Sequence, residues 1–425
     1  MPQNKVQTPI ADMLEKYNNE QNVRFHMPGH KGRCTFDFFL KNMFEYDVTE
    51  VSGTDNLHNP TGAIREAELL LAKAYSAEKS HILVNGSTCG ILSVITAVFE
   101  KGDRVILDTN SHYSVYNAME LAGAELIKIQ SITAEKIVDT MAKYKIKGVV
   151  ITRPTYFGRC SDIKSISQMC RENNVLLITD EAHGAHLNFA KQGYPESAVK
   201  YSDFTIQSAH KTLGALNQSA YLHLNGQGME YAKKIKKKLA IFQTASPSYL
   251  IMASADSARA HMEEYGADLL EKLRKNIIWV SKELEKYTDF YISSDTPDRL
   301  VIKTDRTKYT GFFLEKYLRT RSLQVEMSAK DCIVCLCSIF DEVADFEKLV
   351  EELKKIENFS EECNKMSEEN EFLENLKGFI GEKITSDIMA FPPGIPIVRC
   401  GEVLTEEIFN EIAELNAFGA NIVGY

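Results

Sequence analysis

The sequence contains no apolar stretch long enough to cross a membrane, and residues 1–24 are polar, without the apolar core of a secretory signal. It also has no long basic block. The five lysines within residues 233–238 form a short basic run, which is typical of the solvent-facing side of a helix. A net charge of −10 further disfavours a polyanionic partner. We therefore expect a cytoplasmic protein that binds neither membranes nor nucleic acids.

The cysteines show no pattern of pairs. There are nine of them, scattered along the chain, which favours reduced thiols over a disulfide framework. Cys332, Cys335 and Cys337 lie close together in Cys-Ile-Val-Cys-Leu-Cys, but this segment has the composition of a buried strand and no second pair of ligands follows it. We expect no metal site.

The chain is long enough for two or three domains, and its composition, 44% apolar and 25% charged, is that of a globular protein. Short apolar runs alternate with helical patterns, which predicts an α/β fold with a mostly parallel sheet covered by helices. The predicted strands are residues 104–108, 125–129, 148–152, 175–179 and 203–207.

Three regions are expected: an N-terminal arm over residues 1–60, a large domain over 61–290 and a smaller α/β domain over 291–425. An acidic linker is expected near residues 357–372. In the second half of the chain the pattern predicts a long helix at 255–287, strands at 299–303, 324–326 and 333–336, and helices at 310–319, 345–356 and 406–417.

An acid and a lysine follow two of these strands. Asp180 follows the run Val175–Thr179, and Lys211 comes shortly after Gln207. This is typical of a pyridoxal-phosphate site, in which the lysine amine forms a Schiff base with the cofactor aldehyde and a carboxylate keeps the pyridine nitrogen protonated. The alternative is two ordinary buried strands with a charged residue after each.

Other polar residues also follow strands. Ser87 and Thr88 stand in a Gly/Ser/Thr turn between a strand and an apolar helix, where helix N–H groups can bind a phosphate, although a simple helix cap has the same pattern. His112 follows the strand at 104–108. Ligands bind beyond the carboxyl ends of parallel strands, so we expect these side chains to meet in one site.

Together these motifs resemble the Orn/Lys/Arg decarboxylase family, whose members are pyridoxal-phosphate enzymes with the aspartate-aminotransferase (type I) fold. The resemblance spans nearly the whole chain. The segments that carry it are Phe25-His-Met-Pro-Gly-His-Lys, Asn85-Gly-Ser-Thr, Ser111-His-Tyr, Asp180-Glu-Ala-His-Gly, Ser208-Ala-His-Lys, Thr244-Ala-Ser-Pro-Ser-Tyr and Phe391-Pro-Pro-Gly-Ile-Pro.

The resemblance implies a role for each site residue. Lys211 would form the Schiff base, Asp180 would pair with the pyridine nitrogen, His112 would lie over the ring, and His183 would lie near the ring and its phenolic oxygen. The residues gathered near the phosphate would be Ser87, Thr88, Ser208 and His210. Lys211 or His112 would supply the proton that replaces the lost carboxylate.

The implied reaction converts a basic L-amino acid, arginine before lysine or ornithine, to carbon dioxide and an amine of polyamine metabolism. The implied assembly is a homodimer, or a tetramer, with active sites at the subunit interface. The N-terminal segment and the turn with Ser246 and Ser248 would come from the neighbouring subunit. His26 of that segment is a candidate to bind the substrate. We expect no counterpart of the N-terminal wing domain of large family members, which disfavours their ring assemblies.

Three assignments near the substrate are open. Asp55, and after it Glu50, are candidates to bind the distal cation, and surface turns are the alternative. Arg399 stands where family members more often have an apolar residue. It is a candidate to bind a substrate carboxylate, as in related aminotransferases, or to form an ordinary ion pair. An aminotransferase or another amino-acid lyase is therefore the rival function; a non-catalytic relative is disfavoured by the intact Lys211, Asp180 and His112.

Overall fold

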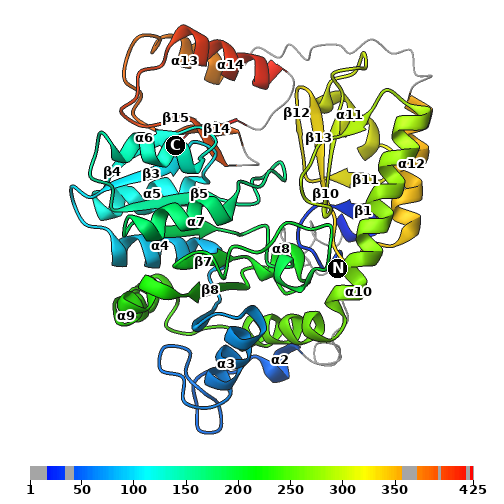
Figure 1. Cartoon of the computed structure of the whole chain (residues 1–425). Helices are drawn as coiled ribbons and strands as arrows, with labels where there is room; N and C mark the ends of the chain where they lie inside the picture. The colour runs from blue at the N-terminus through cyan, green and yellow to red at the C-terminus, as the bar shows by residue number, and fades with distance from the viewer. Residues whose placement is uncertain (1–16, 34–42, 357–370, 391–393, 418–421, 425) are drawn as a thin grey trace, which may run out of the picture.

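The computed structural model describes residues 17–33, 43–356, 371–390, 394–417 and 422–424 (Figure 1). Its centre is a seven-stranded sheet with the order β2-β8-β7-β6-β5-β3-β4. All neighbouring strands are parallel except β8, which is antiparallel to both β2 and β7. The strands are β2 (Lys79–Leu83), β3 (Arg104–Asp108), β4 (Glu125–Ile129), β5 (Gly148–Thr152), β6 (Leu176–Asp180), β7 (Phe204–Gln207) and β8 (Ala220–Leu224). The predicted α/β class and mostly parallel sheet are confirmed.

Helices cover both faces of this sheet because its central strands are apolar on both sides. Val150 of β5 packs in a cluster with α4 (Gly86–Val98), α5 (Tyr113–Ala122) and α9 (Ala232–Phe242). Its neighbours Val149 and Ile151 pack on the other face against α6 (Ala134–Met141) and α7 (Ile163–Glu172). Successive side chains of a strand point to opposite faces, so the continuous apolar run supplies two cores.

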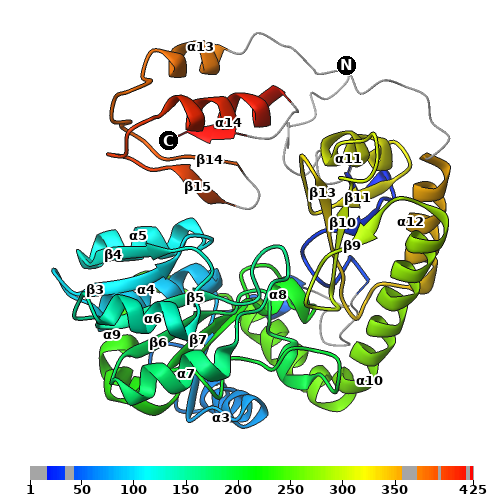
Figure 2. The same ribbon diagram turned by 45° about the horizontal axis from the view of Figure 1, so that its top comes forward.

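The long helix α10 (Tyr249–Tyr287) leads from this sheet to a second unit (Figures 1 and 2). That unit is an antiparallel sheet in the order β12-β13-β10-β9, covered by α11 (Gly311–Arg319) and α12 (Val343–Ile356). Its strands are β9 (Tyr291–Ile292), β10 (Arg299–Lys303), β12 (Met327–Ala329) and β13 (Cys332–Leu336). Both views place α8 (Ala209–Thr212) between the two sheets.

The C-terminal range predicted as one small domain contains a further, separate sheet. Its strands, in the order β15-β14-β16, are β14 (Ile388–Ala390), β15 (Ile395–Val398) and β16 (Ile422–Gly424), and they pack with α13 (Glu371–Lys377) and α14 (Glu406–Ala417) around their own apolar cluster. Most of the expected acidic linker, residues 357–370, and residues 391–393 of the Phe391 motif lie outside the described residues.

The N-terminal segment joins the two larger units. Strand β1 (Val23–Phe25) pairs in parallel with β11 (Leu323–Val325) of the second unit. A few residues later the Gly29 N–H donates to the His210 carbonyl at 2.9 Å, next to the predicted Schiff-base lysine. The buried Lys31 ammonium donates to the Leu336 carbonyl at 2.7 Å. The motif Phe25-His-Met-Pro-Gly-His-Lys is therefore a brace between the units.

Two of the differences from the prediction concern β8 and α10. Strand β8 was not predicted, because the buried polar His223 interrupts its apolar run. Helix α10 begins at Tyr249, earlier than the predicted residue 255, because the Ser248 side chain accepts the Ile251 N–H and caps it. In the described ranges no helix is long and apolar enough to cross a membrane.

Candidate active site

The carboxyl ends of the central strands open into a cavity of about 410 Å³. All eight residues predicted to bind the cofactor line it, and they come from four separate segments. They are Ser87, Thr88, His112, Asp180, His183, Ser208, His210 and Lys211. The convergence follows from the topology, because parallel strands present their carboxyl ends at one edge of the sheet.

Lys211 is half-buried at this edge, and its amine lies 3.0 Å from His183 Nε2. Burial lowers the pKa of Lys211, against the opposing charges of Asp180 and Glu326. Asp180 ends β6, and its Oδ1 accepts the Ala182 N–H at 3.1 Å. Burial raises the pKa of Asp180, while the Lys211 charge lowers it. Burial also lowers the pKa of His183 well below its usual value, and its Nδ1 is buried without a partner.

The N-terminus of α4 forms a second corner of the cavity. Asn85, which precedes this helix, accepts the Thr244 N–H with its side-chain oxygen and does not cap α4. The Gly86 N–H donates to the Gln218 carbonyl at 2.8 Å, so the N–H groups of the first turn that follow Gly86 have no side-chain cap. Ser208 Oγ donates to Ser87 Oγ at 3.0 Å, which joins hydroxyls from two different strand ends. His210 Nδ1 lies 2.9 Å from the Ser219 carbonyl and donates to it, and burial lowers the pKa of His210 to about 4. This corner is built for an anion.

His112 stands just before α5 and caps it. Its Nδ1 accepts the Ser114 N–H at 3.3 Å, and Ser114 Oγ lies 2.8 Å from the same atom. The proton of the neutral ring therefore resides on Nε2. Burial, and then the Lys211 charge, lower the pKa of His112 to about 3, so the ring stays neutral.

Glu326 and Tyr156 are among the residues of this cavity that sequence reasoning missed. The Tyr156 hydroxyl donates to Glu326 Oε1 at 2.6 Å, and the Met27 N–H donates to Oε2 at 2.9 Å. The Tyr156 ring stands edge-on to His183, with centroids 5.3 Å apart. Glu326 follows β11, at the end of a predicted strand, so the signal that identified Asp180 was present here too.

These groups fit pyridoxal phosphate. An amine with lowered pKa suits a Schiff base, and a buried acid at the end of the neighbouring strand suits the pyridine nitrogen. The uncapped N-terminus of α4, with the hydroxyls of Ser87, Thr88 and Ser208, suits a phosphate. The unpartnered Nδ1 of His183 leaves a polar atom for a ligand in the same cavity.

Three predicted substrate residues lie apart from the lining of this cavity as the described part of the chain forms it. His26 uses both ring nitrogens, with the Tyr17 hydroxyl and the Met27 carbonyl each 2.6 Å away. Asp55 binds backbone N–H groups at the start of α3 (Ala63–Tyr75). Arg399 pairs with Asp387 and Glu120, each at 3.2 Å. These residues remain predictions that a single chain does not bring to the site.

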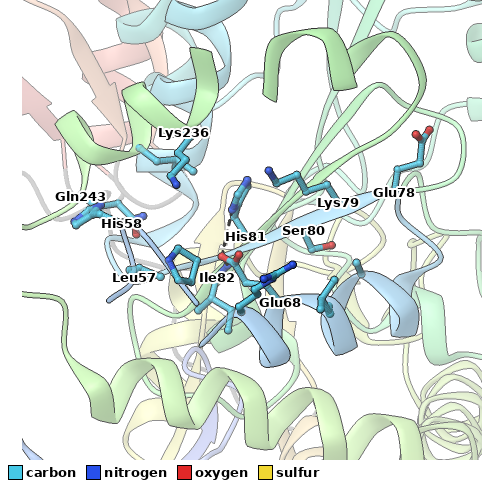
Figure 3. Close-up of a pocket in the computed structure, with 15 residues that line it drawn as sticks. Leu57, His58, Glu68, Glu78, Lys79, Ser80, His81, Ile82, Lys236 and Gln243 are labelled. Carbon is cyan, nitrogen blue, oxygen red and sulfur yellow. Dashed lines mark hydrogen bonds and ion pairs between the residues drawn. The ribbon is translucent and has the colours of Figure 1, made fainter. Parts of the chain in front are cut away.

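A second pocket, of about 230 Å³, lies at the open edge of the sheet between α3, β2 and α9 (Figure 3). Its described lining residues are all different from those of the first cavity. Glu68 Oε1 lies 3.2 Å from Nδ1 of the buried His81, whose ring lies between Lys79 and Lys236. Lys211 and Asp180 lie in the other cavity, so we place the chemistry there.

Comparison with known proteins agrees with this geometry. The family model described as "Orn/Lys/Arg decarboxylase, major domain" matches residues 8–304. An arginine decarboxylase of Bacillus subtilis is 30% identical and covers 94% of this chain and 92% of its own length. One of Halalkalibacterium halodurans is 29% identical over 98% of this chain and 95% of its own length.

The lysine decarboxylase LdcF of Francisella novicida shares the fold, with a TM-score of 0.74, 20% identity, and coverage of 99% of this chain and 79% of its own. The family model covers most of the chain, and a relative of nearly equal length supports it. This chain belongs to the Orn/Lys/Arg decarboxylase family and is a pyridoxal-phosphate-dependent decarboxylase of the type I fold.

Proposed function

We propose that this protein decarboxylates a basic L-amino acid, arginine before lysine or ornithine, to the corresponding amine. One observation carries the proposal: the Lys211 amine, a buried acid at a strand end and a helix N-terminus without a side-chain cap share a cavity whose wall carries a further acid, Glu326. The preference for arginine is supported by the two relatives of nearly equal length named arginine decarboxylase. The lysine decarboxylase LdcA of Pseudomonas aeruginosa matches only 60% of this chain.

Pyridoxal phosphate, when bound, supplies an electron sink for the pair of electrons left when carbon dioxide departs. Lys211 would hold the cofactor covalently, and Asp180 would keep a proton on its ring nitrogen. Ser87, Thr88 and Ser208, with the N–H groups of the first turn of α4 that follow Gly86, would bind its phosphate. His112 would cover the ring and limit access of water.

The proton that replaces the carboxylate would come from Lys211 or His112. Burial lowers the pKa of Lys211, which favours exchange of a proton at its amine. His112 carries its proton on Nε2, because Nδ1 is occupied by Ser114. Both side chains line the cavity, so both remain candidates.

Glu326 is the strongest candidate to bind the distal cation of the substrate. Its carboxylate accepts one hydrogen bond at each oxygen, which leaves further lone pairs for an ammonium or guanidinium group. It lines the same cavity as Lys211 and comes from the second unit, opposite the strand ends. We place it ahead of Asp55, whose oxygens are occupied by five backbone N–H groups.

We also propose a homodimer in the cytoplasm. Exposed apolar side chains gather on α2 (Met43–Tyr46), the following turn and α3, including Phe44, Val51 and Leu69. The two segments expected to reach a neighbour meet on this surface, because His58 Nε2 lies 2.8 Å from the Thr244 carbonyl. The seven described cysteines are all free thiols, which supports a reducing compartment.

The test is to load the purified protein with pyridoxal phosphate and supply arginine, lysine or ornithine separately, measuring carbon dioxide and amine by mass spectrometry. We expect amine and carbon dioxide in equal amounts, with arginine the best substrate. Borohydride should fix the cofactor to Lys211, and Lys211→Ala should abolish this attachment. A 2-oxo acid in place of carbon dioxide would overturn the proposal, as would attachment that survives in the variant.

A further inference from the structure

A row of buried polar side chains crosses the central sheet next to the active site. Five neighbouring strands contribute one side chain each, in spatial order: Ser80 from β2, His223 from β8, Gln207 from β7, Glu181 directly after β6 and Arg153 directly after β5. Each is at most 4% exposed. Apolar residues fill most of the surrounding core, so this row is a departure from the pattern of the sheet.

From Ser80 to Glu181 the hydrogen bonds of the row are continuous, and all point toward Glu181. Gln207 Nε2 donates to Glu181 Oε2 at 2.6 Å, so the Gln207 oxygen is free to accept, and His223 Nε2 donates to it at 3.1 Å. His223 Nδ1 then carries no proton and accepts from Ser80 Oγ at 2.8 Å. On the other side, Arg153 Nη1 lies 3.8 Å from Glu181 Oε1.

Glu181 is fully buried and receives two further donors. Ser197 Oγ donates to Oε2 at 2.8 Å, and the Ala198 N–H donates to Oε1 at 2.7 Å. Three donors and a guanidinium suit an ionised carboxylate. Burying a charged group costs stability even when it is paired, and an apolar residue in its place is often no worse for the fold. The row therefore calls for an explanation other than stability.

The members of the row stand beside the site residues along the chain. Glu181 follows Asp180, and Gln207 precedes Ser208 in the segment that leads to Lys211. Backbone bonds join the same strand ends: the Glu181 N–H donates to the Ile206 carbonyl at 2.8 Å, and the Arg153 N–H to the Asp180 carbonyl at 2.9 Å. The Glu181 side chain thus adds a charged cross-link exactly where three strands end at the cavity.

We propose that Glu181 is a positioning residue of the decarboxylase. Its carboxylate ties the ends of β5, β6 and β7 together and so fixes the spacing between the Asp180 carboxylate and the Lys211 amine. Glu181 itself lies outside the lining of the cavity, so it acts through its neighbours and not on the substrate. The inference rests on the proposed roles of Asp180 and Lys211.

The test is Glu181→Gln, which keeps the shape and removes the charge. In the cofactor-loaded protein we expect the dissociation constant of pyridoxal phosphate to rise about tenfold or more, since the variant loses hydrogen bonds to a charged group. We also expect a shift in the pH midpoint of the visible absorbance of the bound cofactor, and a fall in kcat per loaded site larger than any change in KM.

If Glu181 has a purely structural role, Glu181→Gln should reduce the amount of folded protein. The dissociation constant of the cofactor, kcat, KM and the absorbance spectrum of the loaded fraction should then stay unchanged. That result would overturn the inference. Glu196→Gln is the matched control, because Glu196 is an exposed acid of the same loop whose side chain pairs with Lys164; its constants should equal those of wild type. Wild type that fails to bind the cofactor would instead refute the proposed function.

Two further variants keep the test decisive. The double change Glu181→Gln with Gln207→Glu returns a carboxylate to the contact between β6 and β7, and it should recover part of the lost cofactor affinity. If Glu181→Gln does not fold, Ser197→Ala removes a single donor to the same carboxylate. Ser197→Ala should raise the dissociation constant of pyridoxal phosphate and shift the pH midpoint of the absorbance in the direction expected for Glu181→Gln, by a smaller amount. Unchanged values would reject the role of Glu181.

Discussion

At the scale of single residues, Glu326 and Asp55 show how acids with the same chemistry acquire different tasks. Asp55 stands in a turn-rich segment and Glu326 follows β11, and either carboxylate could pair with a cation. Asp55 accepts the N–H groups of Thr61 and Gly62 at 2.9 and 2.8 Å, whereas Glu326 faces the cavity of Lys211. The difference arises from tertiary contacts, which is why sequence reasoning favoured Asp55 and overlooked Glu326.

Replacement of Glu326 should weaken the substrate more than it slows the chemistry. We expect Glu326→Gln to raise the KM for arginine about tenfold or more, because a charged partner of the distal guanidinium is lost. Steady-state kinetics with a fixed cofactor load will measure this. Glu347→Gln, an exposed acid on α12, is the control. An unchanged KM for Glu326→Gln would remove this residue from the substrate site.

Replacement of Asp55 should affect the fold. Burial raises the pKa of this carboxyl, but the N–H groups of Thr61, Gly62, Asn56 and Arg65 together lower it to about 2. Asp55→Ala leaves these donors to water, so we expect the free energy of unfolding to fall by about 1–2 kcal/mol, as for a lost helix cap. Urea unfolding will measure the change, with exposed Asp47→Ala as control. A raised KM at unchanged stability would restore the predicted substrate role.

The pH dependence of stability tests the buried charge of Glu181. Burial raises the pKa of this carboxyl to about 7, although the Ala198 N–H and Arg153 oppose the change. The folded protein therefore holds the proton more tightly than the unfolded chain. The contribution of the protonated Glu181 to the free energy of unfolding is therefore fully present below the usual glutamate pKa of 4.5. It is lost as the pH rises through about 7.

Glutamine does not ionise, so the variant Glu181→Gln lacks this dependence. The difference in unfolding free energy, wild type minus variant, should become smaller between about pH 5 and about pH 8. Urea unfolding at both values measures it. A difference that grows with pH would mean that the ionised carboxylate stabilises the fold, against our view that its charge serves the site.

At the scale of secondary-structure elements, the sequence predicts a strand well where a short apolar run stands between polar turns. Strands β3, β4, β5 and β10 have the predicted bounds, because each is a short run enclosed by polar turns. Strand β8 was missed because it carries His223, a member of the buried polar row. A hydrophobicity pattern predicts that such polar residues are exposed. Their hydrogen-bond partners stand on neighbouring strands, which the pattern does not show.

The N-terminal brace makes a prediction at the same scale. A Cβ added at Gly29 would lie 2.7 Å from the Lys211 carbonyl oxygen and 3.3 Å from the Thr212 nitrogen. Gly29→Ala should therefore push the brace away from the α8 turn, weaken cofactor binding and lower the free energy of unfolding by about 1–3 kcal/mol, as other overpacked sites do. Cofactor titration and urea unfolding will show both effects.

Gly378→Ala is the matched control, because the nearest atom to its added Cβ is 3.4 Å away. It should behave as wild type in both measurements. Normal cofactor affinity in Gly29→Ala would show that the brace holds the two units together without acting on Lys211.

At the scale of the whole molecule, the residues predicted to bind the cofactor meet within one chain, but one surface of that chain is unusually apolar. Phe44 is 94% exposed, and α2 and α3 lie together at the lower end of the view in Figure 1, beside the start of α10. The Tyr249 hydroxyl donates to the Asp55 carbonyl and fixes this surface to the Ser246 turn. Sequence alone could indicate which segments reach a neighbour, through family resemblance, but not that they share one surface.

A second copy of this chain is the occupant that we propose for this surface. The apolar side chains of the surface and the two segments expected to complete the neighbouring site lie side by side.

Phe44→Asp combined with Leu69→Asp should convert a dimer to a monomer, since burying a charge in an interface is costly. Activity should fall in parallel, because each site would lose groups from its neighbour. Analytical ultracentrifugation and activity at matched concentrations will test this. Leu121→Asp, an exposed apolar residue on α5, is the control. A fully active monomer would show that each active site is complete within one chain.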